Sequence, residues 1–213
     1  MNASANEARS ANTREKILDA AEALFVEHGF AATSLRAIAT LAEVNLAAAN
    51  YHFGSKMGLL AAVLHRHIHP VNEERLRRLN ALERSDRSLT LKDVLEALFV
   101  PLAETMSGSS LPALMGRIYS EPESIIRPII ADEFMELGDR FQSAIARTLP
   151  DLPAEELRWR FHFMIGSMIH LCKFQSPIIG ESPRITFTQG IEQLITYSMT
   201  GLSAPVASTD VAI

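Results

Sequence analysis

The stretch from Thr33 to Lys56 places the strongest constraint on how this 213-residue chain can fold. Apolar residues recur at helical spacing in its first half, and the pattern is interrupted just before Asn45. Thr33 is placed to cap a first helix and Asn45 a second, because a side-chain oxygen there can accept a hydrogen bond from the first turn. Gly54 supplies the left-handed backbone that ends a helix. The stretch predicts two short helices joined by a tight turn.

Two helices joined in this way form a helix-turn-helix, whose second helix enters the major groove of DNA. The run Ala47–Ala49 is small enough for a close approach to the groove, and Asn50 can pair with an adenine edge. Tyr51, His52 and Lys56 follow, where their polar groups can reach phosphate oxygens. The competing interpretation is an amphipathic helix pair inside an all-α core, since such spacings also arise by chance.

Landmarks of a known family occur around this motif in order and at fixed spacing. They are Ile17-Leu18-Asp19-Ala20-Ala21, Leu24-Phe25, Gly29-Phe30, Thr33-Ser34, Ile38-Ala39, Val44, Tyr51-His52-Phe53 and Ser55-Lys56. Through them the first third of the chain resembles the N-terminal domain of the tetracycline-repressor (TetR) family of bacterial transcriptional regulators. Asn50 departs from that family, which more often has Tyr there, and Asn45-Leu46-Ala47 departs from its usual Ser-x-Gly/Ala start. Both departures bear on which operator is read.

Motif and resemblance together predict a set of residues that contact double-stranded DNA. The set is Thr33, Ser34, Arg36, Asn45, Leu46, Ala47, Ala48, Asn50, Tyr51, His52 and Lys56. The alternative function is a helical sensor or adaptor that acts without DNA contact. The presence of Tyr51, His52 and Lys56 argues against that alternative.

Helical periodicity continues through the chain, with no strand pattern and no internal repeat. We therefore expect an all-α protein of about nine helices. The resemblance implies that these form a three-helix head and a helical body for ligand binding and dimerisation. The head is predicted at 13–70, with the helix-turn-helix at 34–53 and Thr13 as the first cap. Pro70 should kink the fourth helix and mark the boundary. The predicted body spans 71–200, between a disordered arm at 1–12 and a flexible tail at 201–213.

Composition sets broad limits on the class of protein. The net charge of −5 argues against a nucleic-acid partner, but residues 36–78 hold six basic and three acidic side chains. This asymmetry fits a DNA-binding head on an acidic body. The single cysteine, Cys172, has the setting of a buried structural thiol and fits a reducing compartment. No signal peptide or membrane span is predicted, so we expect a cytoplasmic protein.

The body is expected to form the homodimer. The helix predicted at 154–173 is apolar on about two sides, so one side can face a second subunit. The resemblance implies that this helix and the one near 187–199 pair with those of a twin chain. Such a dimer would place two heads about 34 Å apart on a pseudo-palindromic operator.

A ligand pocket for a small effector is also predicted within the body. Flexible and aromatic side chains suit variable apolar ligands, and a few polar groups would orient them. The predicted residues are Phe99, Met115, Arg117, Ile118, Tyr119, Phe134, His162 and Met168. The competing interpretation is ordinary core packing. Residues 45–56 and 161–166 also resemble fatty-acid-responsive members of the family, which implies an acyl-type effector.

Metal and catalytic chemistry are not expected from the sequence. His65 and His69 share a helical face, but two histidines alone do not meet the three-ligand requirement of a metal site. No nucleophile motif or phosphate-binding loop is present, so the chain is not expected to be an enzyme or to need a cofactor.

Overall fold

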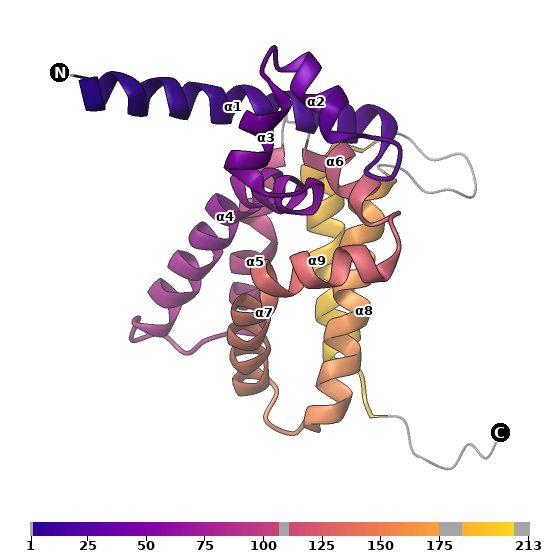
Figure 1. Cartoon of the computed structure of the whole chain (residues 1–213). Helices are drawn as coiled ribbons and strands as arrows, with labels where there is room; N and C mark the ends of the chain where they lie inside the picture. Colours follow the sequence, from indigo (N-terminus) through magenta and orange to yellow (C-terminus); the bar gives the residue numbers. More distant parts are fainter. Residues whose placement is uncertain (1, 107–110, 175–184, 207–213) are drawn as a thin grey trace. The chain divides into compact units, whose positions relative to one another are not determined.

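The computed structural model describes residues 2–106, 111–174 and 185–206, and these contain nine α-helices and no strand (Figure 1). The predicted all-α fold is therefore confirmed. The helices are α1 (Asn2–His28), α2 (Leu35–Leu41), α3 (Leu46–Phe53), α4 (Lys56–Glu83), α5 (Leu91–Met106), α6 (Leu111–Ile118), α7 (Glu123–Thr148), α8 (Ala154–Lys173) and α9 (Phe187–Ser203). Residues 107–110 and 175–184, and the predicted flexible tail from residue 207, lie outside the described residues.

Two compact units make up the chain. The first unit contains Met1–Pro70 together with Ser110–Glu133, and the second contains Val71–Ser109 together with Phe134–Ile213. The first unit thus includes α6 and the first part of α7, which we had placed in the body from the sequence. None of the described helices is both long enough and apolar enough to cross a membrane.

Helix α1 is longer than predicted. It begins at Asn2, so the described part of the predicted disordered arm is helical. Residues 7–12 are solvent-exposed, and the helix formers Glu7, Ala8 and Arg9 favour helix there without burial. Thr13 is not a cap, because its hydroxyl donates to the Arg9 carbonyl inside the helix. On the apolar stripe of α1, Ile17, Ala21 and Phe25 are buried in the first unit.

The α2–α3 connection is built from three local devices. Ser34 rather than Thr33 caps α2, with its Oγ accepting from Ala37 N at 3.1 Å. Asn45 caps α3 as predicted, with Oδ1 accepting from Ala48 N at 2.7 Å. Between them the N–H of Glu43 donates to Thr40 O, and that of Val44 donates to Ala39 O. This pair of bonds is a Schellman motif, which satisfies the last carbonyls of α2.

Glu43 occupies the left-handed position of that motif, with φ of +57°. A side chain is strained there, so Glu43→Gly is expected to stabilise the protein by about 0.5–1 kcal/mol, after allowance for the entropy that glycine loses on folding. Chemical denaturation measures the change. Glu43→Ala is the control, because it removes the charge but keeps Cβ. Equal gains in both variants would show that charge, rather than backbone strain, is responsible.

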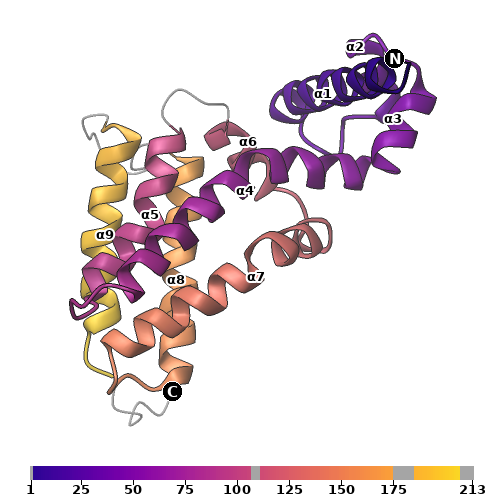
Figure 2. The same ribbon diagram turned by 90° about the vertical axis from the view of Figure 1, so that its left-hand side faces the viewer.

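In the second unit α9 packs against both α5 and α8 (Figure 2). Gly190 permits the close contact with α8, since an added Cβ would lie 2.7 Å from Leu171 Cδ1. Arg160 of α8 donates to the carbonyls of Leu202 and Ala204 at 2.9 and 2.6 Å, beyond the predicted end of α9. The first residues of the predicted flexible tail are therefore held in place. Burial raises the pKa of Cys172 to about 11, as expected for a structural thiol.

Candidate nucleic-acid interface

Helix α3 has one face in the core and one face in solvent. Ala49 is fully buried, and it anchors the helix to the rest of the first unit. Ala47 and Asn50 are exposed, and Tyr51 is 85% exposed. No described part of the chain covers this outward face. This outward face thus presents small residues, an amide and a phenol, and it can fit into a groove of DNA.

The structure divides the predicted DNA-contact residues into three groups. The exposed ones are Ser34, Arg36, Asn45, Ala47, Asn50 and Tyr51. Leu46, Ala48, His52 and Lys56 are half-buried. Thr33 is buried, and its hydroxyl donates to Gly29 O at 2.7 Å. Thr33 therefore holds the α1–α2 turn, and the exposed group forms the candidate interface.

Lys56 differs most from its predicted role as a phosphate contact. Its Nζ donates to the carbonyls of Phe30 and Thr33 at 2.8 Å each, with a longer contact to Ala31 at 3.4 Å. Nζ also lies 4.3 Å from the centroid of the Phe30 ring. An ammonium has three N–H donors, and these contacts account for all of them. The geometry makes Lys56 a positioning residue that fixes the α1–α2 turn from α4.

Lys56→Met is expected to destabilise the first unit by about 2 kcal/mol, because part-buried carbonyls lose charge-assisted donors while the stem is kept. The free energy of unfolding measures this loss, and Lys16→Met, at an exposed lysine of α1, is the control. If stability is unchanged and only DNA affinity falls, the phosphate contact predicted from the sequence is the correct role.

Apart from Arg36, the other arginines of the 36–78 region are also engaged within the protein. Arg66 pairs with Asp19 at 2.6 Å and with Glu22. Arg75, Arg77 and Arg78 belong to the second unit, where Arg75 is buried and donates to Leu98 O at 2.7 Å. The local charge excess is therefore not a continuous surface for DNA. Only Arg36 of these six arginines and lysines is both exposed and on the helix-turn-helix.

Two residues that the sequence analysis did not assign to the head help to shape it. Arg117 donates to the carbonyls of Val26 and Glu27 at 3.1 and 3.3 Å, at the end of α1. Glu121 accepts from the N–H of Phe30 at 2.9 Å. Together they hold the start of the α1–α2 turn. The lone charge of Arg117 on an apolar helix was a signal that it needs a partner, but the partner lies 91 residues away.

Comparison with known proteins agrees with this geometry. Residues 17–63 match the family described as bacterial regulatory proteins, tetR family. Residues 95–201 match the family described as tetracyclin repressor-like, C-terminal domain. The chain belongs to the TetR family. The resemblance inferred from the sequence is therefore confirmed, and this TetR-family protein is a transcriptional regulator with a helix-turn-helix domain.

Individual relatives resemble this TetR-family protein over different lengths. A probable HTH-type transcriptional regulator from Bacillus subtilis, YttP, is 45% identical over 49 residues, which cover 23% of this chain and 24% of that protein. The fatty acid degradation regulator FadR from Bacillus halodurans is 14% identical, with a TM-score of 0.67 over 91% of this chain and 97% of that chain. NalD, the secondary repressor of the MexAB-OprM multidrug efflux pump in Pseudomonas aeruginosa, is 20% identical, with a TM-score of 0.66 over 90% and 97%. These two structures share the fold.

The predicted effector residues of this TetR-family protein fall in different units. Met115, Arg117, Ile118 and Tyr119 lie in the first unit, and Phe99, Phe134, His162 and Met168 lie in the second. Phe99, Met115, Ile118 and Met168 are buried, whereas His162 is exposed. The effector set therefore stays a prediction.

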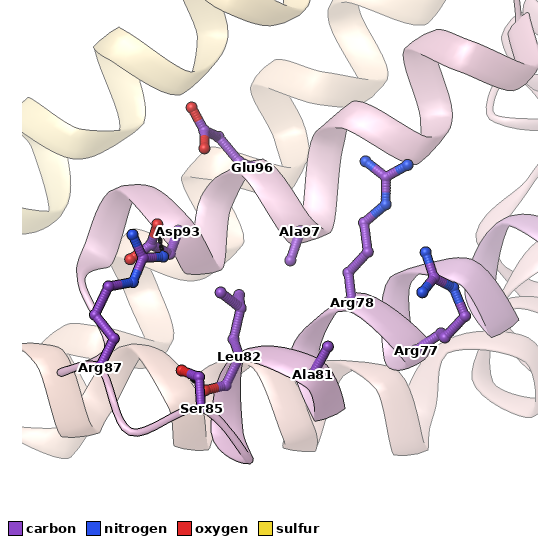
Figure 3. Close-up of a pocket in the computed structure, with 9 residues that line it drawn as sticks. All are labelled: Arg77, Arg78, Ala81, Leu82, Ser85, Arg87, Asp93, Glu96 and Ala97. Carbon is purple, nitrogen blue, oxygen red and sulfur yellow. Dashed lines mark hydrogen bonds and ion pairs between the residues drawn. The ribbon is translucent and has the colours of Figure 1, made fainter.

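A cavity of about 470 Å³ lies in the second unit, between the end of α4 and the start of α5 (Figure 3). Five of the nine residues that line it are charged, among them Arg77, Arg78 and Glu96. An ion pair of 2.9 Å joins Arg87 to Asp93 at its edge. None of the predicted effector residues lines it. Pockets for apolar ligands are mainly apolar, so this cavity does not match the predicted effector.

Proposed function

We propose that this TetR-family protein is a dimeric repressor that reads a pseudo-palindromic operator with the exposed face of α3 and releases it when a small apolar effector binds. The observation that carries the DNA-reading part is the placement of α3, with Ala49 fully buried and Asn50 and Tyr51 in solvent. A rigidly anchored helix with an outward amide can present one hydrogen-bonding pattern to base edges. The same exposed face disfavours an adaptor without DNA contact, and the repressor is proposed to have no catalytic activity.

The proposed dimer forms through α8 and α9. Leu157, Met164, Met168 and Cys172 on α8 are buried, so this face belongs to the core of the second unit. Trp159 and Phe163 lie outside that face and are 56% and 60% exposed, with their rings stacked at 5.9 Å. Exposed aromatic clusters of this kind are typical of protein interfaces. A second copy, which carries the same patch, is the partner that twofold symmetry favours.

The proposed effector is an apolar, acyl-type molecule. Support comes from the buried apolar residues in the predicted set and from similar structures, among them FadR, whose name refers to fatty acid degradation, and SmeT in complex with triclosan. Release follows from linkage, since an effector that prefers a body conformation unfavourable for DNA must weaken the operator complex. A coupling of about 1–3 kcal/mol would change operator affinity by about 5–150-fold. Acyl compounds that neither raise the unfolding temperature nor change DNA affinity would exclude this effector class.

Selection of bound sequences from random DNA, followed by two substitutions, tests the DNA-reading role. Asn50→Ala is expected to change the preferred base at one position of each half-site, where a bidentate contact contributes about 1–3 kcal/mol of discrimination. Tyr51→Phe, which removes only a hydroxyl, is expected to weaken binding to all sequences by a similar factor.

Gel-shift titrations at several salt concentrations complete the test, because phosphate contacts make affinity fall steeply as salt increases. Thr40→Ala on the outward side of α2 is a control for general surface changes, since its hydroxyl donates to the Arg36 carbonyl. A selected sequence that is the same for wild type and Asn50→Ala would contradict the assignment of Asn50 to base reading.

A further inference from the structure

Three potential metal ligands meet in the first unit although they come from distant parts of the sequence. His65 and His69 lie one turn apart on α4, and their rings stack with centroids 4.4 Å apart. Glu133 of α7 lies against them, with its Oε1 2.7 Å from Nδ1 of His65. One ligand atom from each of the three lies within 4.8 Å of the others. The carboxylate of this cluster therefore comes from a position 68 residues after His65.

We infer that His65, His69 and Glu133 bind a divalent transition-metal ion of the zinc type. Two imidazoles and one carboxylate form a ligand set used by protein zinc sites that keep a fourth position open. Ligand atoms around tetrahedral zinc lie about 3.3 Å apart, given metal–ligand distances of about 2.0–2.1 Å. Binding would therefore lengthen the 2.7 Å contact between Nδ1 of His65 and Oε1 of Glu133 by about 0.6 Å. The side chain of His65 is 54% exposed and that of Glu133 is 15% exposed, so an ion can enter from solvent.

His67 provides an internal comparison because it lies between the two ligands but outside the cluster. Its Nε2 is 2.7 Å from Oε2 of Glu22. Glu22 also accepts from Arg66, and that guanidinium extends the network to Asp19. A cation so close to Glu22 makes that carboxylate a poor metal ligand. The same helix therefore carries one histidine in an ion-pair network and two beside Glu133.

The position of the proposed site gives metal binding a consequence for the first unit. His69 directly precedes Pro70, the last residue of the first chain segment in that unit, and Glu133 is the last residue of its other segment. An ion bound to both would join the two segments at the points where they leave the unit. The second segment also carries Arg117 and Glu121, which hold the α1–α2 turn. Metal binding is thus expected to stabilise the DNA-reading unit by linkage.

Titration of tag-free, metal-depleted protein with Co²⁺ tests the site, because tetrahedral Co²⁺ has strong visible absorption, and calorimetry with Zn²⁺ gives the affinity. We expect one ion per chain. His65→Gln, His69→Gln and Glu133→Gln should each weaken Zn²⁺ binding by about 10-fold or more, whereas His67→Gln should change it by less than about 2-fold. Thermal unfolding of each metal-free variant verifies that it is folded.

Either of two results would overturn the site: no stoichiometric Co²⁺ spectrum in the wild type, or equal losses in His67→Gln and the three ligand variants. The expected increase in operator affinity with Zn²⁺ rests on the proposed function, and it is measured separately by gel shift with wild type and His69→Gln. Metal binding without any change in operator affinity would retain the site and exclude its regulatory effect. Absence of operator binding would contradict the proposed function alone, because the Co²⁺ titration contains no DNA.

Discussion

Phe163→Glu is expected to convert the proposed dimer into a monomer at micromolar concentration and to abolish detectable operator binding. The Phe163 ring is mostly exposed and stacks on Trp159, so the proposed interface has its aromatic centre there. A carboxylate in that position would face its symmetry-related copy without a partner, and such central interface residues contribute about 2 kcal/mol or more. Loss of the dimer also removes the avidity of two heads, which contributes about 10²–10⁴-fold to affinity.

Light scattering after size-exclusion chromatography measures the mass, and gel shift measures operator binding. Met135→Glu is the matched control, because Met135 of α7 is 63% exposed in the same unit and receives the same charge. Circular dichroism should show unchanged helix content in both variants, since neither side chain belongs to the core. A dimeric Phe163→Glu variant would place the interface elsewhere on the second unit.

Gly58→Ala is expected to have the largest effect on the stability of the first unit. An added Cβ at Gly58 would lie 2.3 Å from the carbonyl oxygen of Phe53, at the end of α3. This neighbour is backbone, so relief requires a shift of α3 relative to the first turn of α4. Ser55 reinforces the junction, because its Oγ accepts from Gly58 N at 3.0 Å. Overpacking of this kind costs about 1–3 kcal/mol, and we expect the upper part of that range.

The same shift would move Tyr51, so operator affinity should fall together with stability. Denaturant unfolding and gel shift measure the two effects. Gly138→Ala is the control, since nothing lies within 4 Å of an added Cβ in the middle of α7. There the higher helix propensity of alanine should stabilise by up to about 1 kcal/mol. We therefore expect Gly58→Ala to lower the free energy of unfolding and Gly138→Ala to raise it. A Gly58→Ala variant as stable as the wild type would refute the steric argument.

Features that depend on local chemistry were readable from the sequence. Asn45 caps α3 and Gly54 ends it as predicted, and the bounds of α8 agree with the predicted 154–173. Caps, left-handed glycines and apolar periodicity act over about four residues, so the necessary information lies within a short window. The family landmarks added the head-and-body organisation. The N-terminal arm was predicted to be disordered but is helical from Asn2. A solvent-exposed helix has no apolar stripe, so only weak helix propensities indicate it in the sequence.

Only the tertiary structure decided which polar side chains are available for function. Lys56 and Thr33 are residue types that commonly contact DNA, yet both hold the α1–α2 turn. Arg75 is also basic, but it is buried. Glu133 joins His65 across 68 residues, and Arg117 joins Val26 across 91. A hydrogen bond is directional and short, so its partner is chosen by how distant helices pack. Periodicity and spacing along a single sequence do not show which distant helices pack together.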